Sequence, residues 1–334
     1  MGVVFQVPAS LFTAVTSGLE KLNIPVDRLI EKACLRMWHY EDPQTLIPGV
    51  HYYRLYGAAA RAFGSECFGG LLPEILPIRS YGVVGTKIAR TLTVYDAVRT
   101  ASAVMSQITN VAAYRPCEDD ERFWWFRQRY QDADAGLRQL ELASIAYMID
   151  IVRLDAGPDW RPEAIVFQSD AIPGVERLEQ FADADVRWRS GKSGIEIPRS
   201  LLARPVAPSD LPTARATDDL SAFQKPSGDL VTALRQLVRS YLLFGRPGVE
   251  EIADAAGMGV RTLQRRLARE GLTFKRIVDQ ARFLMATELM RDPDIPLVEI
   301  AHDLGYGDQA NFNHAFRRWA GVAPSEYRRE SRPG

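Results

Sequence analysis

Two different spacings of apolar residues divide the chain. In the C-terminal third, apolar residues recur three or four positions apart almost without interruption, which predicts a series of short amphipathic helices. The first two hundred residues mix such stretches with shorter apolar runs typical of strands. Helices are expected over residues 7–22, 25–35, 47–63, 93–108 and 137–154, and strands over residues 111–115, 122–128, 164–168 and 186–188. The pattern predicts an α+β N-terminal domain followed by an all-α C-terminal domain.

A segment with neither spacing separates the two parts. Residues 203–228 contain four prolines and few large aliphatic side chains. Such a composition is typical of an interdomain linker. We therefore expect one domain over residues 1–205, a linker over residues 206–227 and a second domain over residues 228–334.

The second domain contains a short helix that ends at a glycine. It covers about residues 249–256 and is followed by Gly257. In a helix-turn-helix unit a small residue is needed where the second helix crosses the first, and a glycine relieves the backbone at the turn. Ala253 and Gly257 meet these two requirements.

The helix expected over residues 260–270 has an apolar side and a polar side. Val260, Leu263 and Leu267 fall on the apolar side. The polar side consists of Arg261, Gln264, Arg265, Ala268 and Arg269. Arginine is the commonest reader of guanine in the major groove, and glutamine pairs with adenine. For this helix taken alone, a solvated charged face remains the alternative.

The same arrangement appears a second time along the chain. Ala301 and Gly305 stand, relative to their turn, where Ala253 and Gly257 stand in the first unit. The following helix, over residues 309–319, has a stripe of Phe312, Phe316 and Trp319, and projects Ala310, Asn313, His314 and Arg317 elsewhere. Between the units, residues 274–290 predict one longer helix with Ile277, Ala281, Leu284 and Leu289 at core spacing. Two such units in series favour DNA binding over a merely solvated face.

Residues 230–330 resemble the DNA-binding domain of the AraC/XylS family. The resemblance is carried by Gly259-Val260-Arg261-Thr262-Leu263-Gln264-Arg265, Ile300-Ala301-His302-Asp303-Leu304-Gly305-Tyr306 and Phe316-Arg317-Arg318-Trp319, and continues through residues 321–325. It covers the whole C-terminal third. It implies seven helices, with two recognition helices that enter successive major-groove segments about 34 Å apart.

The resemblance also implies which side chains meet double-stranded DNA. In the first unit the base contacts fall on Arg261, Gln264 and Arg265, with Arg269 beside them. In the second unit they fall on Gln309, Ala310, Asn311 and His314, flanked by Asn313, while Arg317 holds phosphate. Since alanine can at most touch a thymine methyl group, we expect the first unit to set most of the sequence preference.

The N-terminal part resembles the arabinose-binding-like regulatory domain of one AraC branch, which includes ornithine-utilisation and virulence regulators. The residues that carry the likeness are Gly82-Val83-Val84-Gly85, Thr91-Leu92-Thr93-Val94-Tyr95-Asp96-Ala97 and the block over residues 197–205. The resemblance implies a domain that senses an effector and can form a homodimer. The apolar stripe of the helix over residues 137–154 is a candidate dimer surface, or equally part of the domain's own core. It does not identify the effector.

Composition and charge restrict the class of protein. The net charge is −1, but residues 227–334 carry 16 Lys and Arg against 14 Asp and Glu, and it is local charge that faces phosphates. No apolar stretch is long enough to span a membrane, and the first residues lack the basic start of a secretory signal. Cys34, Cys67 and Cys117 are scattered and odd in number, which fits neither a disulfide framework nor a metal site. We expect a cytoplasmic protein without metal or cofactor.

Three functions are compared on this basis. The leading one is a transcription regulator that responds to a small-molecule effector, with RNA polymerase as a further partner. The second is a constitutive DNA-binding regulator whose N-terminal domain only forms dimers or contacts RNA polymerase. The third, an enzyme, lacks support because no nucleophile elbow, phosphate-binding loop or His-x-x-x-His pair is found.

Two features of the N-terminal part bear on an effector. The aromatic run over residues 123–126 lines a pocket or fills a core, and the sequence leaves both open. Arg79 and Arg122 are candidates to pair with an anionic effector, but single arginines usually lie on the surface. No ligand site follows from these residues.

Overall fold

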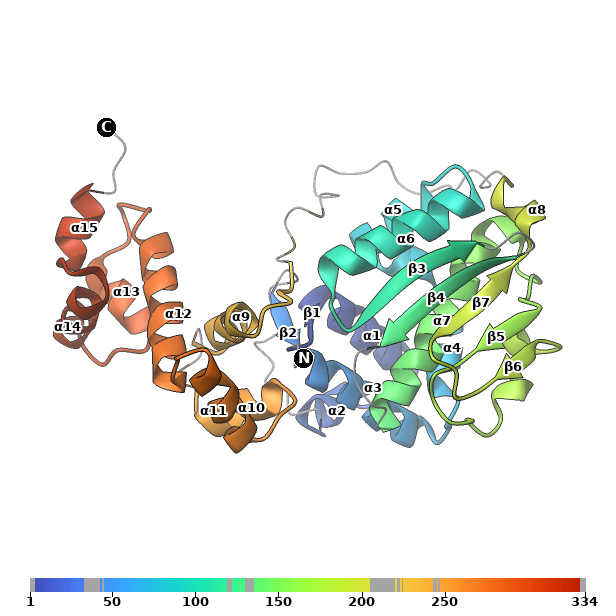
Figure 1. Cartoon of the computed structure of the whole chain (residues 1–334), viewed down its shortest axis with the longest axis horizontal. Coiled ribbons are helices and arrows are strands. Elements are labelled where there is room, and N and C mark those ends of the chain that lie inside the picture. Colours follow the sequence, from blue (N-terminus) through green and yellow to red (C-terminus); the bar gives the residue numbers. More distant parts are fainter. Residues whose placement is uncertain are drawn as a thin grey trace. The chain divides into compact units, whose positions relative to one another are not determined.

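The computed structural model describes residues 4–32, 45–118, 122–129, 135–204, 225–242 and 247–330, together with residues 43, 220, 223 and 245. It contains two compact units. One comprises Gln6–Thr45 and His51–Pro226, and the other comprises Met1–Phe5, Leu46–Val50 and Ser227–Gly334. We refer to them as the N-terminal and the C-terminal unit (Figure 1). Most of the expected linker, including residues 206–219, lies outside the described residues.

The N-terminal unit mixes helices and strands, as predicted. Its helices are α1 (Ala9–Lys21), α2 (Val26–Lys32), α3 (Gly49–Phe63), α4 (Phe68–Ile75), α5 (Gly82–Ala89), α6 (Val94–Ile108), α7 (Ala135–Ala156) and α8 (Arg199–Leu202), the first two residues of α3 belonging to the C-terminal unit. Its strands are β1 (Gln6–Pro8), β3 (Ala112–Glu118), β4 (Phe123–Arg129), β5 (Ala164–Val166), β6 (Asp185–Arg187) and β7 (Ser193–Ile197). The expected helices correspond to α1, α2, α3, α6 and α7, and the expected strands to β3 to β6. The helices α4, α5 and α8 and the strands β1 and β7 were not predicted.

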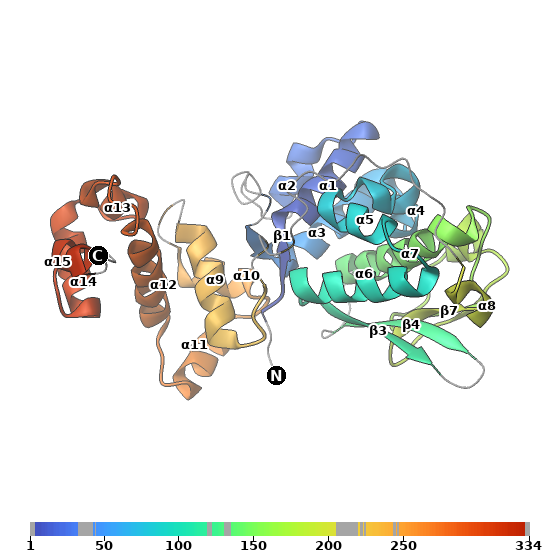
Figure 2. The ribbon, with the colours of Figure 1, turned by 90° about the horizontal axis from the view of Figure 1, so that it is seen from above.

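Five strands form one mixed sheet in the order β3-β4-β7-β5-β6. Neighbouring strands are antiparallel except β5 and β6, which are parallel. In β4 the side chains of Phe123, Trp125 and Arg127 are buried, while Trp124 and Phe126 between them are half-exposed and stack at 5.2 Å on the other face. This alternation is the period of two that a strand imposes. One face of the sheet is therefore internal, and α6 and α7 lie along it (Figure 2).

The long helix α7 is the centre of the N-terminal unit. Apolar side chains are buried on every side of it: Leu137, Leu140, Leu142, Ala143, Ile145, Ala146, Met148, Ile149, Ile151 and Val152. It packs against α4, α6 and β7. The expectation that the helix over residues 137–154 provides a dimer surface is therefore wrong, since this helix is covered by its own unit.

The helices α4 and α7 cross in close contact at a glycine. The backbone N–H of Gly69 donates to Oε1 of Gln139 at 2.9 Å. A β-carbon at Gly69 would lie 2.2 Å from the backbone oxygen of Gln139 and 3.0 Å from the backbone nitrogen of Ala143. Because both neighbours are backbone atoms, neither can rotate away.

The C-terminal unit contains the helices α9 (Leu230–Leu242), α10 (Val249–Ala255), α11 (Val260–Arg269), α12 (Phe274–Leu289), α13 (Leu297–Asp303), α14 (Gln309–Ala320) and α15 (Pro324–Glu330), with the strand β2 (Leu46–Pro48). Over its described residues from Ser227 to Glu330, with their gaps, these seven helices are those that the resemblance implied. One core joins them, and it includes Val4 from the start of the chain. The placement of Leu284 in that core was wrong, because its side chain is 47% exposed on α12.

The contact at Gly69 predicts a specific loss of stability. Gly69→Ala should lower the free energy of unfolding of the N-terminal unit by about 1–3 kcal/mol, because the added methyl group meets backbone that cannot move. Chemical denaturation of the whole protein measures this change. Gly191→Ala is the matched control, since a β-carbon there would meet nothing within 4 Å. Equal stability of the two variants would contradict the prediction.

Candidate nucleic-acid interface and effector cavity

The turn between α10 and α11 has the geometry of a helix-turn-helix. Gly257 adopts a left-handed backbone conformation with φ of +68°, which favours glycine. The N–H of Met258 then donates to the carbonyl oxygen of Ala253 at 3.0 Å. Ala253 is buried at the crossing of the two helices, as predicted.

The turn between α13 and α14 repeats this geometry. Gly305 has φ of +74°, and the N–H of Tyr306 donates to the carbonyl oxygen of Ala301 at 2.9 Å. Ala301 is buried as Ala253 is. The second turn is one residue longer, so α14 starts 49 positions after α11 although α13 starts 48 positions after α10.

The buried residues of the two second helices set the correspondence between them. Leu263 and Leu267 in α11 take the places of Phe312 and Phe316 in α14, all four fully buried. With this register Arg261, Gln264 and Arg265 correspond to Ala310, Asn313 and His314. The predicted contact residue Gln309 corresponds to the half-buried Val260, and Asn311 corresponds to Thr262.

The polar side chains on the outer face of α11 are exposed and have no polar partner among the described residues. Arg261, Gln264, Arg265 and Arg269 are exposed. Across the described residues 4–330, with their gaps, these four side chains form no hydrogen bond or ion pair with the chain. Three guanidinium groups and one amide are thus presented along one face of one helix. They can donate to base edges and to phosphates without first breaking a contact of their own.

On the outer face of α14, unlike that of α11, some of the polar side chains are half-buried or hydrogen-bonded within the chain. Asp308 caps the helix, accepting from the backbone N–H of Asn311 at 2.7 Å and from the Nδ2 of the same residue at 2.7 Å. The side-chain amide of Asn311 is therefore engaged at the cap. Asn313 is half-buried, whereas Ala310, His314 and Arg317 are exposed. Arg318, next to Arg317, is paired with Asp279 of α12 at 3.2 Å.

The helix α12 joins the two helix-turn-helix units rigidly. Phe283 packs on Phe316 and on Tyr327, at ring-centroid distances of 5.6 and 6.2 Å. The buried guanidinium of Arg282 lies 4.8 Å from the ring centroid of Tyr306, the residue after the second turn. These contacts fix the second unit to α12, while Ile277 and Ala281 of the same helix lie in the shared core.

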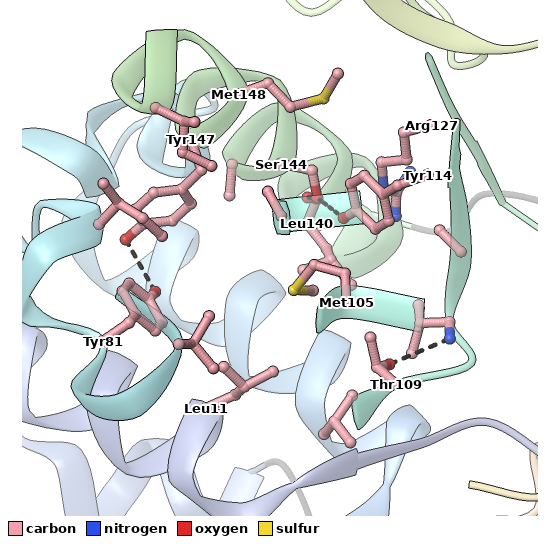
Figure 3. Close-up of a pocket in the computed structure, with 18 of the residues that line it drawn as sticks. Leu11, Tyr81, Met105, Thr109, Tyr114, Arg127, Leu140, Ser144, Tyr147 and Met148 are labelled. Atoms are coloured by element: carbon pink, nitrogen blue, oxygen red, sulfur yellow. Dashed lines mark hydrogen bonds between the residues drawn. The ribbon is translucent and has the colours of Figure 1, made fainter. Parts of the chain in front are cut away.

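The N-terminal unit encloses a cavity of about 100 Å³ between the sheet and its helices (Figure 3). Tyr114, Trp125 and Arg127 line it from β3 and β4. The helices α1, α3, α5, α6 and α7 supply the remaining walls, which are mostly aliphatic and aromatic. Ligand pockets are commonly of this kind, apolar with a few polar groups that orient the ligand.

The polar groups of this cavity are mainly tyrosine hydroxyls. Tyr81 donates to Tyr147 at 2.9 Å, and Tyr147 donates to the carbonyl oxygen of Leu76 at 2.9 Å. Tyr52 and Tyr56 share a hydrogen bond of 3.1 Å. Burial raises the pKa of each of these four phenols well above the usual value, so they stay protonated at neutral pH.

The two arginines considered from the sequence lie on the surface, which was the alternative left open for them. Arg79 and Arg122 are exposed and do not line the cavity, and Arg122 lies 3.7 Å from Glu196. The cavity instead receives Arg127, which the sequence analysis did not single out. The sequence did contain a sign of this, because every second residue of a strand lies on the same face, and Arg127 follows Phe123 and Trp125 at that spacing. Of the aromatic run over residues 123–126, Trp125 lines the cavity and Phe123 fills the core.

The described residues show no cluster of His, Cys, Asp and Glu that could hold a metal ion. Cys67 is buried and Cys117 exposed, both as free thiols, and Cys34 lies outside the described residues. None of the helices in the part of the chain that is described has the length and apolar character needed to cross a membrane.

Comparison with known proteins identifies the family. Residues 24–206 match the arabinose-binding domain at the N-terminus of AraC transcription regulators, and residues 252–330 match a helix-turn-helix domain. The chain belongs to the AraC family of transcription regulators. Both resemblances inferred from the sequence are thereby confirmed, as is the α+β domain followed by a helical domain.

Members of the family with similar sequences are known from several bacteria. The transcriptional regulator VirS of Mycobacterium tuberculosis is 34% identical over 192 residues, which is 57% of this chain and 56% of VirS. The ornithine utilization regulator of Pseudomonas aeruginosa is 22% identical over 326 residues, 96% of each chain. The crystal structure of the transcriptional regulator CdpR from Pseudomonas aeruginosa shares 21% identity, covers 91% of this chain and 96% of CdpR, and has a TM-score of 0.41. The match to VirS thus spans about half of that relative's length.

We expect α11 to contact bases and Arg317 of α14 to contact phosphate. Arg265→Ala should weaken binding by about 1–3 kcal/mol and relax the preference at one or two base pairs, because arginine makes a bidentate contact with guanine. Arg317→Ala should weaken binding to all sequences alike and lower the salt dependence by about one counterion, because it removes a phosphate contact.

Selection of bound DNA from a randomised pool distinguishes these effects. Arg115→Ala, which removes an exposed arginine from β3 in the other unit, is the charge-matched control and should leave both the motif and the salt slope unchanged. A new motif for Arg317→Ala together with the old motif for Arg265→Ala would mean that the two roles are reversed.

Proposed function

We propose that the chain is a sequence-specific DNA-binding transcription regulator that responds to a small-molecule effector. The observation that carries the DNA-binding half is the exposed row on α11, Arg261, Gln264, Arg265 and Arg269, with no intramolecular partner across the described residues. The membership of the chain in a family of transcription regulators supports the same conclusion.

On the DNA, the first unit reads bases through Arg261, Gln264 and Arg265. The second unit contributes Ala310, Asn313 and His314 at the corresponding positions, with Gln309 and Asn311 at the start of α14 and Arg317 on phosphate. Since one N–H of the Asn311 side-chain amide already donates to Asp308, only the other N–H and the amide oxygen are available to a base. This supports a division in which the first unit sets most of the sequence preference.

The cavity of the N-terminal unit favours an effector over constitutive binding. A domain that served only to form dimers or contact RNA polymerase would need no cavity lined by hydroxyl groups. Here Tyr52, Tyr56, Tyr81 and Tyr147 surround one space whose remaining walls are mainly carbon. We assign effector sensing to residues 1–205, linkage to residues 206–227 and DNA binding to residues 228–334.

Further partners follow from this function. We infer contact with RNA polymerase, assembly as a homodimer through a surface other than α7, and action in the cytoplasm, where bacterial DNA lies. We infer no enzymatic activity, because the relatives are transcription regulators. Sedimentation of the whole protein at micromolar concentration tests the homodimer, and a single monomeric species at all concentrations would exclude it.

Selection of bound genomic fragments tests the central proposal. The whole protein should retain specific fragments from the genome of its host, and affinity should fall steeply with salt because phosphate contacts release counterions. Small metabolites related to the genes beside those fragments are then added. An effector should change the affinity for the fragment, since it shifts the protein between states of different DNA affinity.

Two outcomes would overturn separate halves of the proposal. The triple variant Arg261→Ala, Arg265→Ala and Arg269→Ala is the negative control and should retain no fragment. If the original protein also retains none at low salt, DNA binding is excluded. Retention that no metabolite alters, either in affinity or in transcription from the selected promoter, would favour the constitutive regulator. The Arg115→Ala protein again serves as the control for loss of one surface charge.

A further inference from the structure

The cavity of the N-terminal unit contains one buried cation. Arg127 lies on β4, opposite Tyr114 of β3, with its side chain directed into the cavity (Figure 3). The residue is 1% exposed. Its Nε and Nη1 atoms are buried and have no hydrogen-bond partner among the described residues. Arginine keeps its charge in proteins, so this positive charge lies in a mainly apolar cavity with two of its three nitrogens unpaired.

None of the residues described as lining the cavity is Asp or Glu. The buried carboxylate of Glu141 does not line the cavity; it accepts from the hydroxyl of Ser193 and from the backbone N–H of Gln168. Burial keeps the pKa of Tyr52, Tyr56, Tyr81 and Tyr147 high, so these hydroxyls remain neutral. The wall of the cavity therefore supplies no negative charge.

A buried charge without a partner is unfavourable, and proteins normally pair it or neutralise it. Since no described residue pairs with Arg127, a molecule from outside can do so. We propose that the cavity binds a small apolar monocarboxylate, with its carboxylate paired to the guanidinium of Arg127 and its hydrocarbon part among the aromatic walls. This inference rests on the proposed function, because it gives the chemical class of the effector.

Size and charge restrict this class further. A cavity of about 100 Å³ is of the order that holds a single benzene ring. Arg127 is the one cation among the described lining residues, so it matches one negative charge and not the two of a phosphate monoester. A planar carboxylate also fits the fork of a guanidinium with two parallel hydrogen bonds. An amine of the same size is excluded, because it would add a second buried positive charge.

The first experiment measures binding to the whole protein by calorimetry. The probes are benzoate, phenylacetate and hexanoate, each compared with its neutral amide and with benzylamine as the cation. At least one carboxylate should bind about 10- to 100-fold more tightly than its amide, the ratio expected of a charge-assisted hydrogen bond. If none of the three carboxylates binds, or if an amide binds as well as its acid, the inference is wrong.

Variants of Arg127 connect that selectivity to this side chain. Arg127→Met keeps the length and removes the charge, so it should abolish the preference for acid over amide. Arg127→Lys keeps the charge but loses the fork for two parallel hydrogen bonds, so it should retain only part of the preference. Arg115→Met, on the exposed face of the neighbouring strand β3, is the control and should bind like the original protein. An unchanged preference in Arg127→Met would overturn the inference.

A second measurement separates ligand binding from a structural role. Without ligand, Arg127→Met should melt at a higher temperature than the original protein, because an apolar side chain replaces an unpaired buried charge. A lower melting temperature would mean that Arg127 supports the fold, and the inference would fail. The proposed function fails differently, through fragments that are not retained or whose binding no metabolite alters. If a neutral effector acts equally on the original protein and on Arg127→Met, the proposed function holds and only the inference of a carboxylate effector is wrong.

Discussion

The N-terminal unit depends on the burial of one helix on all its sides. Because α7 runs through the unit with apolar side chains around its whole circumference, α4, α6 and the sheet must all pack against it. The close crossing at Gly69 brings α4 against its backbone on one side. Another side of α7 lines the cavity, through Leu140, Ala143, Tyr147 and Ile151. The same packing that stabilises the unit thus also creates its binding space.

The path of the chain provides a physical link between that space and the DNA-binding helices. Val4 lies in the core of the C-terminal unit, and three residues later Val7 lines the cavity. The segment Leu46–Val50 likewise belongs to the C-terminal unit, and α3 continues from it to Tyr52 and Tyr56 in the cavity wall. At both places the chain thus passes from a cavity-lining segment directly into a segment of the other unit. This covalent continuity is compatible with the effector response proposed above.

The sequence predicted the helical unit better than the mixed one, for a physical reason. In the C-terminal unit each helix buries one stripe, so the period of the apolar residues reveals both the helix and its inner face, as at Leu263 and Leu267. In the N-terminal unit α7 is buried all around, and its pattern looked like that of an amphipathic surface helix. Leu284 was misplaced because spacing alone does not show which of two adjacent stripes on α12 is covered. The strand β7 was missed because Ser193 and Gly194 open it, and neither residue resembles a strand former.

The cavity could not be inferred from the sequence in the same way, because its walls come from segments far apart in the chain. Tyr52 and Tyr147 are almost a hundred positions apart, yet both line it. Arg127 was the exception. In the run Phe123-Trp124-Trp125-Phe126-Arg127, a strand places every second residue on the inner face, so the charge had to point inward with Phe123 and Trp125. A buried charged residue normally has a partner, and the described residues of the cavity wall include no acidic one, which is the ground for the proposal that the partner comes from outside the chain. The residue that conflicts most with the hydrophobic pattern of its strand is therefore the one that best indicates what the cavity binds.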